Sequence, residues 1–372
     1  MHDLYLKIFV KLGLPEILAQ VSWSIIPFIG VAALLVFVVL FLVLMERKVL
    51  AWLTIRKGPN RVGPFGLLQT FADAIKLLFK EDIVSSKADK ILFTIAPIIF
   101  FAPVMVIYGL LPFTGNLLAI NTAAGLFLIL AISSISTVGI VIAGWASNNK
   151  YSLLGGMRAA AQAISYEIPL AIAALGIALL AGSMNMLDIV NNQSGGLSGI
   201  GILNWNIFSW NILPAFIGFI IFFICSIAEI NRIPFDLPEA ESELVSGYNT
   251  EYSGMKFALF FLAEYAALFI ISVLTVTLFL GGYLSPFNDY LSVILFKNII
   301  LNKQILNIFV HIEQGFWLIA KTYFLIFATM WIRATLPRLR ADQLMGFSWK
   351  FLLPLSFVNL IIVAVYRYIF PI

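Results

Sequence analysis

The sequence predicts an all-α, polytopic membrane protein with about eight transmembrane helices and an amphipathic helix on the inner membrane surface. Three observations support this fold class: the 372-residue chain is 61% hydrophobic, only 11% of its residues are charged, and its mean hydropathy is +1.00. A soluble domain carries about 25% charged residues. Apolar runs long enough to cross a bilayer as helices recur along the whole chain. We therefore expect a single membrane domain over residues 1–372.

The expected spans are the long apolar stretches, whose edges the pattern fixes only to within a few residues. They cover residues 21–45, 91–112, 123–146, 159–182, 211–229, 257–282, 316–334 and 350–369. The N-terminus lacks the pattern of a cleaved signal peptide, so we expect the first span to be retained. Segment 284–315 is weakly polar, and the pattern leaves open whether it forms a surface helix or a long loop.

The distribution of Lys and Arg predicts the orientation of these spans. The loops after the first, third, fifth and seventh spans, with their edges, hold nine, two, two and four of the 23 basic residues. By the positive-inside rule these loops face the cytoplasm or an equivalent compartment, and both termini face outward. The net charge of +4 is explained by this orientation signal and implies no nucleic-acid partner.

The first inner loop, residues 46–90, contains a predicted interfacial helix over residues 65–80. Its apolar and polar residues recur at spacings of three and four, which places each set on one face of a helix. The helix is about 24 Å long at 1.5 Å per residue, too short to span a bilayer. An ordinary surface helix is the alternative. The preceding Pro59, Gly63, Pro64 and Gly66 favour a tight non-helical approach and the interfacial position.

The second inner loop, within residues 229–256, is strongly acidic and carries six of the chain's 19 carboxylates. Asp236 and Glu239 have the spacing of an N-cap and its capping-box partner, Pro238 suits a first helical turn, and Gly247 suits its end. A preference of acids for a helix N-terminus explains one or two of them. It does not explain six, because crowded carboxylates repel one another. We therefore expect raised pKa values and proton exchange near neutral pH in this loop.

Three glutamates are predicted to lie inside the membrane. Glu167 follows Arg158 by nine residues and Glu264 follows Lys256 by eight, which places them about 13 Å and 12 Å along their helices. Glu229 is expected at the inner end of the fifth span. Acids at such depth are functional candidates, and the alternative for each is an acid at a helix end. Pro169 is expected to free a backbone carbonyl beside Glu167.

The content of metal-binding side chains excludes several functions. The chain has one cysteine, Cys225, and two histidines, His2 and His311. From this content we expect no iron–sulfur cluster, structural zinc site or pair of axial haem ligands in this chain. We expect no metal or flavin to be bound by this chain, so any redox centre belongs to a partner subunit.

Five stretches resemble the quinone-site membrane subunit family of respiratory complex I. This family includes the H subunit of bacterial NADH:quinone oxidoreductase and the first mitochondrially encoded subunit, and the plastid and cyanobacterial A subunit is similar. The stretches are MERK (45–48), RKGPNRVGPFGLLQTFADAIKLLFKE (56–81), ASNNKYSLLGGMRAAAQAISYEIPL (146–170), AEINRIPFDLPEAESELVSGYNTEYSGMKFALFFLAEY (228–265) and WIRATLPRLRADQLM (331–345). Segment 284–315 has no clear counterpart.

The resemblance implies a membrane subunit that forms much of a quinone chamber, anchors the hydrophilic redox arm and couples quinone reduction to proton pumping. It implies quinone as the substrate. The implied partners are the iron–sulfur and quinone-headgroup subunits of that arm, small membrane subunits leading to antiporter-like subunits, and the lipid bilayer. A bacterial cell membrane is the expected location, with the mitochondrial inner and thylakoid membranes as alternatives.

The resemblance also implies roles for particular residues. The chamber side and its charge partners comprise Glu46, Arg47, Arg56, Arg61, Asp73, Lys76, Arg158 and Arg232. The proton-coupling residues comprise Glu167, Glu229, Glu239, Glu241, Glu243, Glu251 and Glu264. Two other functions stay open from the residues: the anchor subunit of a membrane-bound hydrogenase or ferredoxin-linked dehydrogenase, and a stand-alone proton-coupled transporter. The chain lacks the paired broken helices typical of many transporters, which disfavours the last.

Overall fold

The computed structural model describes residues 16–115, 118–194, 206, 209–238, 241–287 and 303–370, without the side chains of 16–28, 241–242 and 303–305. These residues form helices and connecting turns, and no strand occurs among them. The all-α fold class is therefore confirmed.

Seven helical segments of the described chain are long and apolar enough to cross a membrane. They are α2 (Glu16–Leu53), α4 (Lys90–Leu110), α5 (Gly125–Ala146), α6 (Lys150–Ala181), α10 (Gly254–Phe279), α12 (Lys303–Thr335), and α13 (Ala341–Phe347) continued by α14 (Leu353–Ile369). The fifth predicted span is the shorter apolar helix α8 (Phe216–Glu229). All eight predicted spans are thus helical and in the predicted order; seven reach membrane length and α8 is shorter.

Several helix edges differ from the prediction. Helix α6 begins at Lys150 rather than 159, and α12 begins at Lys303 rather than 316. The last part of the weakly polar segment 284–315, from Lys303 onward, therefore belongs to the membrane-length helix α12. The helix extends beyond the apolar stretch from which its start was predicted. Residues 288–302 of that segment lie outside the described residues.

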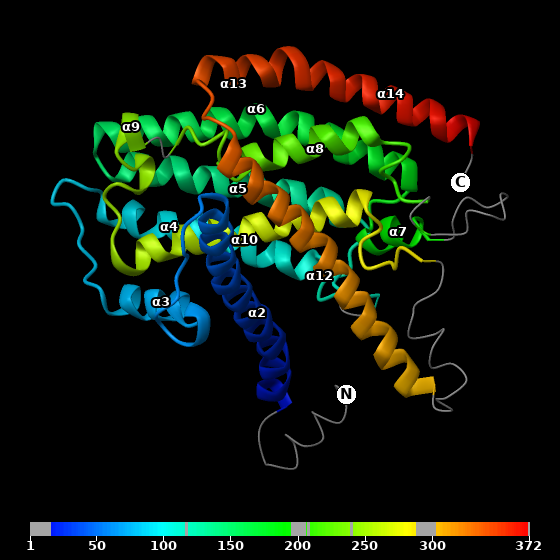
Figure 1. Cartoon of the computed structure of the whole chain (residues 1–372), viewed down its shortest axis with the longest axis horizontal. Helices are drawn as coiled ribbons and strands as arrows, with labels where there is room; N and C mark the ends of the chain where they lie inside the picture. The colour runs from blue at the N-terminus through cyan, green and yellow to red at the C-terminus, as the bar shows by residue number, and fades with distance from the viewer. Residues whose placement is uncertain are drawn as a thin grey trace.

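Helices α4, α5, α6, α8, α10 and α14 run roughly side by side, and α2 and α12 cross them at an angle (Figure 1). Glycines allow some of these helices to approach closely. A Cβ atom added at Gly139 of α5 would lie 2.8 Å from the backbone nitrogen of Phe100 in α4. One added at Gly144 would lie 2.7 Å from the carbonyl oxygen of Ser152 in α6.

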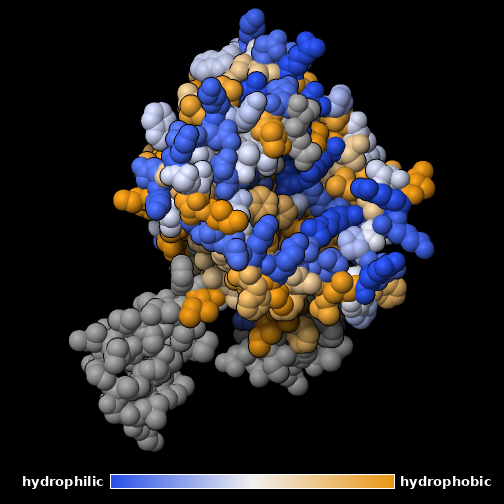
Figure 2. Space-filling model, turned by 90° about the vertical axis from the view of Figure 1, so that its left-hand side faces the viewer, coloured by the Kyte–Doolittle hydropathy of each residue, from blue (hydrophilic) through white to orange (hydrophobic). Residues whose placement is uncertain are grey.

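One end of the bundle gathers α3 (Gln69–Phe79), α9 (Glu241–Leu244) and the 3-10 turn η3 (Gly247–Asn249), whereas α7 (Met186–Asn191) lies at the other end (Figure 1). Figure 2 views the first end and shows hydrophilic side chains over most of it. The loops predicted to face inward therefore share one polar end of the molecule, which we call the inner face.

The amphipathic helix of the first inner loop starts at Gln69, four residues later than predicted. Its approach is non-helical, as expected: Gly63, Phe65 and Gly66 all have φ between 55° and 74°. An added Cβ at Gly66 would collide with the backbone of Pro59. Phe71, Leu78 and Phe79 of α3 are exposed, so the helix presents an apolar surface suited to lipid or another subunit.

The prediction that Pro169 leaves a carbonyl free beside Glu167 needs correction. Proline removes the hydrogen bond that its nitrogen would give to the carbonyl four residues earlier, that of Ser165. The Ser348 hydroxyl donates to this carbonyl at 2.5 Å. Ser348 begins the π-helical turn Ser348–Leu352 between α13 and α14. The carbonyl therefore fixes α14 against α6.

The end of α10 opposite the inner face is closed by a half-buried lysine of α12. Lys321 Nζ donates to the carbonyl oxygens of Leu280, Gly282 and Leu284 at 2.7, 3.1 and 2.7 Å. The same atom lies 4.1 Å from the ring centroid of Trp210. A cation inside a membrane protein is costly unless its donors are used, and here three carbonyls satisfy it.

Candidate functional site

The most deeply buried charged group in the described chain belongs to Glu46, on α2 near the inner face. Its side chain is 4% exposed. Arg232, which follows α8, donates from Nη1 to both carboxylate oxygens at 3.0 Å. Arg333 of α12 donates to the same carboxylate. Three separate parts of the chain thus meet at this acid. We call the group of Glu46, Arg232 and Arg333 the Glu46 cluster.

A second set of charged residues joins α2 to α3. Arg47 Nη1 donates to Asp73 Oδ2 at 2.6 Å, and Lys48 Nζ donates to the Phe65 carbonyl at 2.7 Å. Lys76 is 71% exposed and lies 4.0 Å from Asp73. These contacts hold the amphipathic helix beside the inner end of α2.

The structure does not bring all predicted chamber residues together. Arg56 is exposed and lines a shallow pocket of about 240 Å³ with Trp52 and Lys57. Arg61 is exposed in the loop before α3. Arg158 lies on α6 and pairs with the acidic loop. Only Arg47, Asp73 and Lys76 form one cluster, while Glu46 and Arg232 form another.

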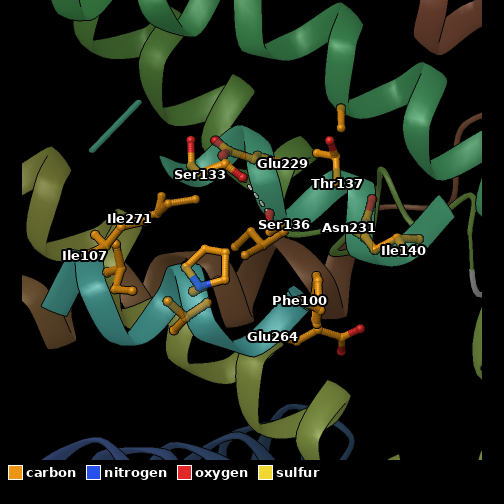
Figure 3. Close-up of a pocket in the computed structure, with 16 residues that line it drawn as sticks. Phe100, Ile107, Ser133, Ser136, Thr137, Ile140, Glu229, Asn231, Glu264 and Ile271 are labelled. Atoms are coloured by element: carbon orange, nitrogen blue, oxygen red, sulfur yellow. Dashed lines mark hydrogen bonds between the residues drawn. The ribbon is translucent and has the colours of Figure 1, made fainter. Parts of the chain in front are cut away.

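A small internal pocket contains two of the three predicted intramembrane acids. Glu229, the last residue of α8, and Glu264 of α10 approach it from opposite sides, with Ser133, Ser136 and Thr137 of α5 along one wall (Figure 3). The pocket has about 60 Å³ of free space, enough for a few water molecules. Hydroxyl groups and carboxylates together provide the polar partners that such water requires.

Glu167 does not line this pocket, but its charge is close enough to interact with that of Glu229. It lies near the middle of α6, because that helix starts earlier than predicted. Five residues before it, the buried Gln162 donates to the carbonyls of Ala228 and Phe235, both at 2.7 Å. Gln162 therefore fixes the end of α8 and the start of the acidic loop against α6.

Besides Gln162, side chains at the start of α6 and after α12 hold the acidic loop through polar contacts. Arg158 Nη1 donates to Glu243 Oε2 at 2.6 Å, and Asn149 Nδ2 donates to Glu251 Oε1 at 2.8 Å. The Ser152 hydroxyl donates to the Tyr248 carbonyl at 3.1 Å. Arg338, which follows α12, donates to Asp236 at 3.2 Å.

Part of the capping prediction lies outside the described residues. Glu239 is not described, nor is the side chain of Glu241. The described helix α9 begins at Glu241. The capping box of Asp236 and Glu239 therefore stays a prediction.

The expectation of a raised pKa is wrong for Glu243. The hydrogen bond and charge of Arg158 lower the pKa of Glu243 from its ordinary value, and Arg338 adds to this effect. A carboxylate whose pKa is lowered in the folded protein contributes to its stability at neutral pH. This contribution is lost as the pH falls through that pKa. The Glu243–Arg158 contact is therefore formed at neutral pH.

Several residues of the site were not predicted from the sequence. Arg333 and Arg338 lie in the quoted stretch WIRATLPRLR, where two basic residues near the inner end of a span were the available signal. Gln162 is a single polar residue in a run of alanines. Tyr248 resembles many other aromatic residues of this chain, and only the folded loop reveals its contact with Glu264.

The described residues contain no group of three or more His, Cys, Asp or Glu side chains arranged to hold a metal ion. Cys225 is buried in α8.

The fold and the site define a helical multi-pass membrane protein with carboxylates placed inside its helix bundle and an acidic loop above them. The chain belongs to the NADH dehydrogenase family, whose model matches residues 26–364. It is similar to the H subunit of the NADH-quinone oxidoreductase of Brevibacillus brevis, with 47% identity over 345 residues, which cover 92% of this chain and 93% of the relative.

Proposed function

We propose that the chain is the quinone-site membrane subunit of a proton-pumping NADH:quinone oxidoreductase. The similarity to the Brevibacillus brevis protein, 47% identity over 92% of the chain, is the observation that carries this proposal. In this proposal the redox centres and the electrons that they deliver belong to partner subunits of the hydrophilic arm. The bacterial relative favours a bacterial cell membrane as its location.

The inner end of α2 and the amphipathic helix α3 form the access side of the quinone chamber in this proposal. The exposed apolar side chains of α3 suit an isoprenoid tail, and Arg47 and Asp73 fix this helix beside α2. Glu46 directly precedes Arg47 on α2, and its cluster with Arg232 and Arg333 supplies charged groups to a polar headgroup. Both loops of the inner face, residues 46–90 and 229–256, form the surface that partner subunits cover.

The acidic loop and the pocket beneath it perform the coupling. Quinone reduction consumes protons, and a loop held by ion pairs can change its contacts when charge changes beside it. Glu251 and Glu243 connect the loop to α6, and Glu229 and Glu264 continue toward the interior with Glu167 close by. Water in the pocket provides the proton link between the two carboxylates that line it.

The direct test of this function is gentle detergent extraction of a tagged chain, followed by native mass determination and a donor:quinone reductase assay. We expect the chain in an assembly of several subunits that reduces quinone with NADH. Activity with reduced ferredoxin but not with NADH would identify ferredoxin, in place of NADH, as the electron donor. A stable, redox-silent homodimer would contradict the proposal and favour the transporter.

Replacement of the acidic-loop carboxylates tests the coupling role. We expect Glu243→Gln, and likewise Glu239→Gln and Glu241→Gln, to slow turnover or lower the proton-to-electron ratio while the complex still assembles. Assembly survives Glu243→Gln because the carboxylate is 60% exposed and exposed ion pairs contribute little stability. Proton pumping and quinone reduction are measured together in vesicles.

Asp188→Asn is the control, since Asp188 is an exposed acid of α7, at the end of the bundle opposite the inner face. It should leave both rates unchanged. Normal turnover and normal pumping in all three loop variants would exclude the loop from coupling.

A further inference from the structure

The side chain of Tyr248 connects the acidic loop directly to a carboxylate inside the bundle. Tyr248 lies in the turn η3, and its side chain is fully buried. Its hydroxyl donates to Glu264 Oε1 at 2.5 Å. Oxygen–oxygen distances of about 2.5–2.7 Å are typical of a hydroxyl that donates to an ionised carboxylate. The geometry is therefore that of a phenol stabilising the charged form of Glu264.

The position of this phenol depends on how the loop is seated on α6. Ser152 donates to the Tyr248 carbonyl at 3.1 Å. A Cβ atom added at Gly155 would lie 2.9 Å from the Tyr248 backbone nitrogen, so the turn packs directly on the α6 backbone. The Tyr248 ring packs edge-on against Phe260 of α10 at 5.5 Å. A shift of the loop relative to α6 therefore moves the hydroxyl relative to Glu264.

Other charged and titratable groups on the helices packed against α10 also have described contacts. Glu229 of α8 lines the same pocket as Glu264, and Glu167 of α6 interacts with Glu229. On α2, α3 and α4 these groups include Glu46 with Arg333, Asp73 with Arg47, and Tyr108 with Phe269. On α6 and α7 they include Arg158 with Glu243, Tyr166 with the Leu344 carbonyl, and Asp188 with Ser183. On α12 they include His311 with Gln314, Glu313 with Trp317, Lys321 with three carbonyls and Tyr323 with Phe269, and on α10 itself Lys256 with Asp82 and Tyr265 with Arg232.

We propose that Tyr248 is a positioning residue that makes the protonation of Glu264 depend on the position of the acidic loop. In the observed position its hydrogen bond favours the ionised carboxylate. When the loop moves, the donor is withdrawn, and Glu264 takes up one solvent proton, which reaches it through the adjoining pocket. Tyr248 keeps its own proton throughout. This inference rests on the proposed coupling function and names one residue that regulates it.

The test is Tyr248→Phe in the complete complex, because this change removes one oxygen atom and keeps the ring on Phe260. We expect normal assembly and near-normal turnover in mildly alkaline solution. The acid limb of the pH–rate profile of quinone reduction should move about one pH unit upward, since the ionised carboxylate has lost a hydrogen-bond donor. In a Glu264→Gln background the same change should have no effect on the profile.

Tyr252→Phe is the matched control. It removes the same atom from a neighbouring buried tyrosine whose ring stacks on Phe93 at 4.0 Å, and it should leave the acid limb in place. An unchanged acid limb in Tyr248→Phe, or loss of assembly, would overturn the inference even if Glu264→Gln impairs pumping. Normal turnover and pumping in Glu264→Gln would instead remove this carboxylate from the proposed coupling function.

Discussion

Glu46→Gln is expected to cause the largest loss of stability and activity of any conservative change in this chain. The carboxylate is 4% exposed and accepts from both Arg232 and Arg333. Glutamine keeps the shape but removes the negative charge that both guanidinium groups contact. Removal of one partner from a buried ion pair costs about 3–5 kcal/mol. We expect a lower melting temperature of the detergent-solubilised complex and nearly complete loss of quinone reduction.

The matched control is Asp73→Asn on α3, which removes the carboxylate partner of the neighbouring Arg47. The Arg47 side chain is 43% exposed, and an exposed pair contributes about 0–1 kcal/mol. Its effect on the melting temperature should therefore be small. Equal melting temperatures for Glu46→Gln and the unmodified complex would show that Glu46 is not needed to neutralise the two arginines.

Gly155→Ala is expected to reduce coupled turnover severalfold although alanine is the better helix former. The added Cβ would lie 2.8 Å from Gly247 Cα and 2.9 Å from Tyr248 N. Both atoms are backbone, so the turn η3 must move away from α6. Overpacking of this kind costs about 1–3 kcal/mol, and it displaces the residue that donates to Glu264. Quinone reduction and proton pumping in vesicles measure the effect.

Gly176→Ala provides the control on the same helix. Its Cβ would meet only Asn359 Nδ2, at 3.5 Å, which is an ordinary contact. Alanine gains about 1 kcal/mol in helix propensity, so stability and turnover should be kept or slightly improved. If Gly155→Ala also kept normal stability and turnover, the close contact between α6 and the turn η3 would not be needed for function.

The sequence predicts the spans well because each depends on local composition. An apolar run of bilayer length has to form a helix wherever it lies, since its backbone groups must be paired within the segment. The glycines and prolines before α3 likewise predict its non-helical approach from conformational preference alone. Helix edges are less well predicted. Helix α12 starts at Lys303 in a weakly polar stretch, where hydropathy gives no boundary.

The residues of the candidate site were likewise predicted only in part from the sequence. The six acids of residues 229–254 mark the inner loop as unusual, and Glu229 and Glu264 are recognisable from their apolar surroundings. The partners of these acids are not recognisable, because they come from distant parts of the chain. Glu46 and Arg333 are separated by 287 positions. Nothing in the local pattern of either one indicates the other.

Composition and local spacing suffice to establish the membrane fold, the order of its spans, the polar inner face and the acids of the second inner loop. Which charges neutralise one another follows from helix packing instead. Packing placed Arg158 on Glu243 and so lowered the pKa of that acid, where crowding alone predicts the opposite. It also brought Ser348 to the carbonyl that Pro169 frees. Electrostatic and hydrogen-bond energies depend on distances between atoms, and those distances exist only once the helices have packed.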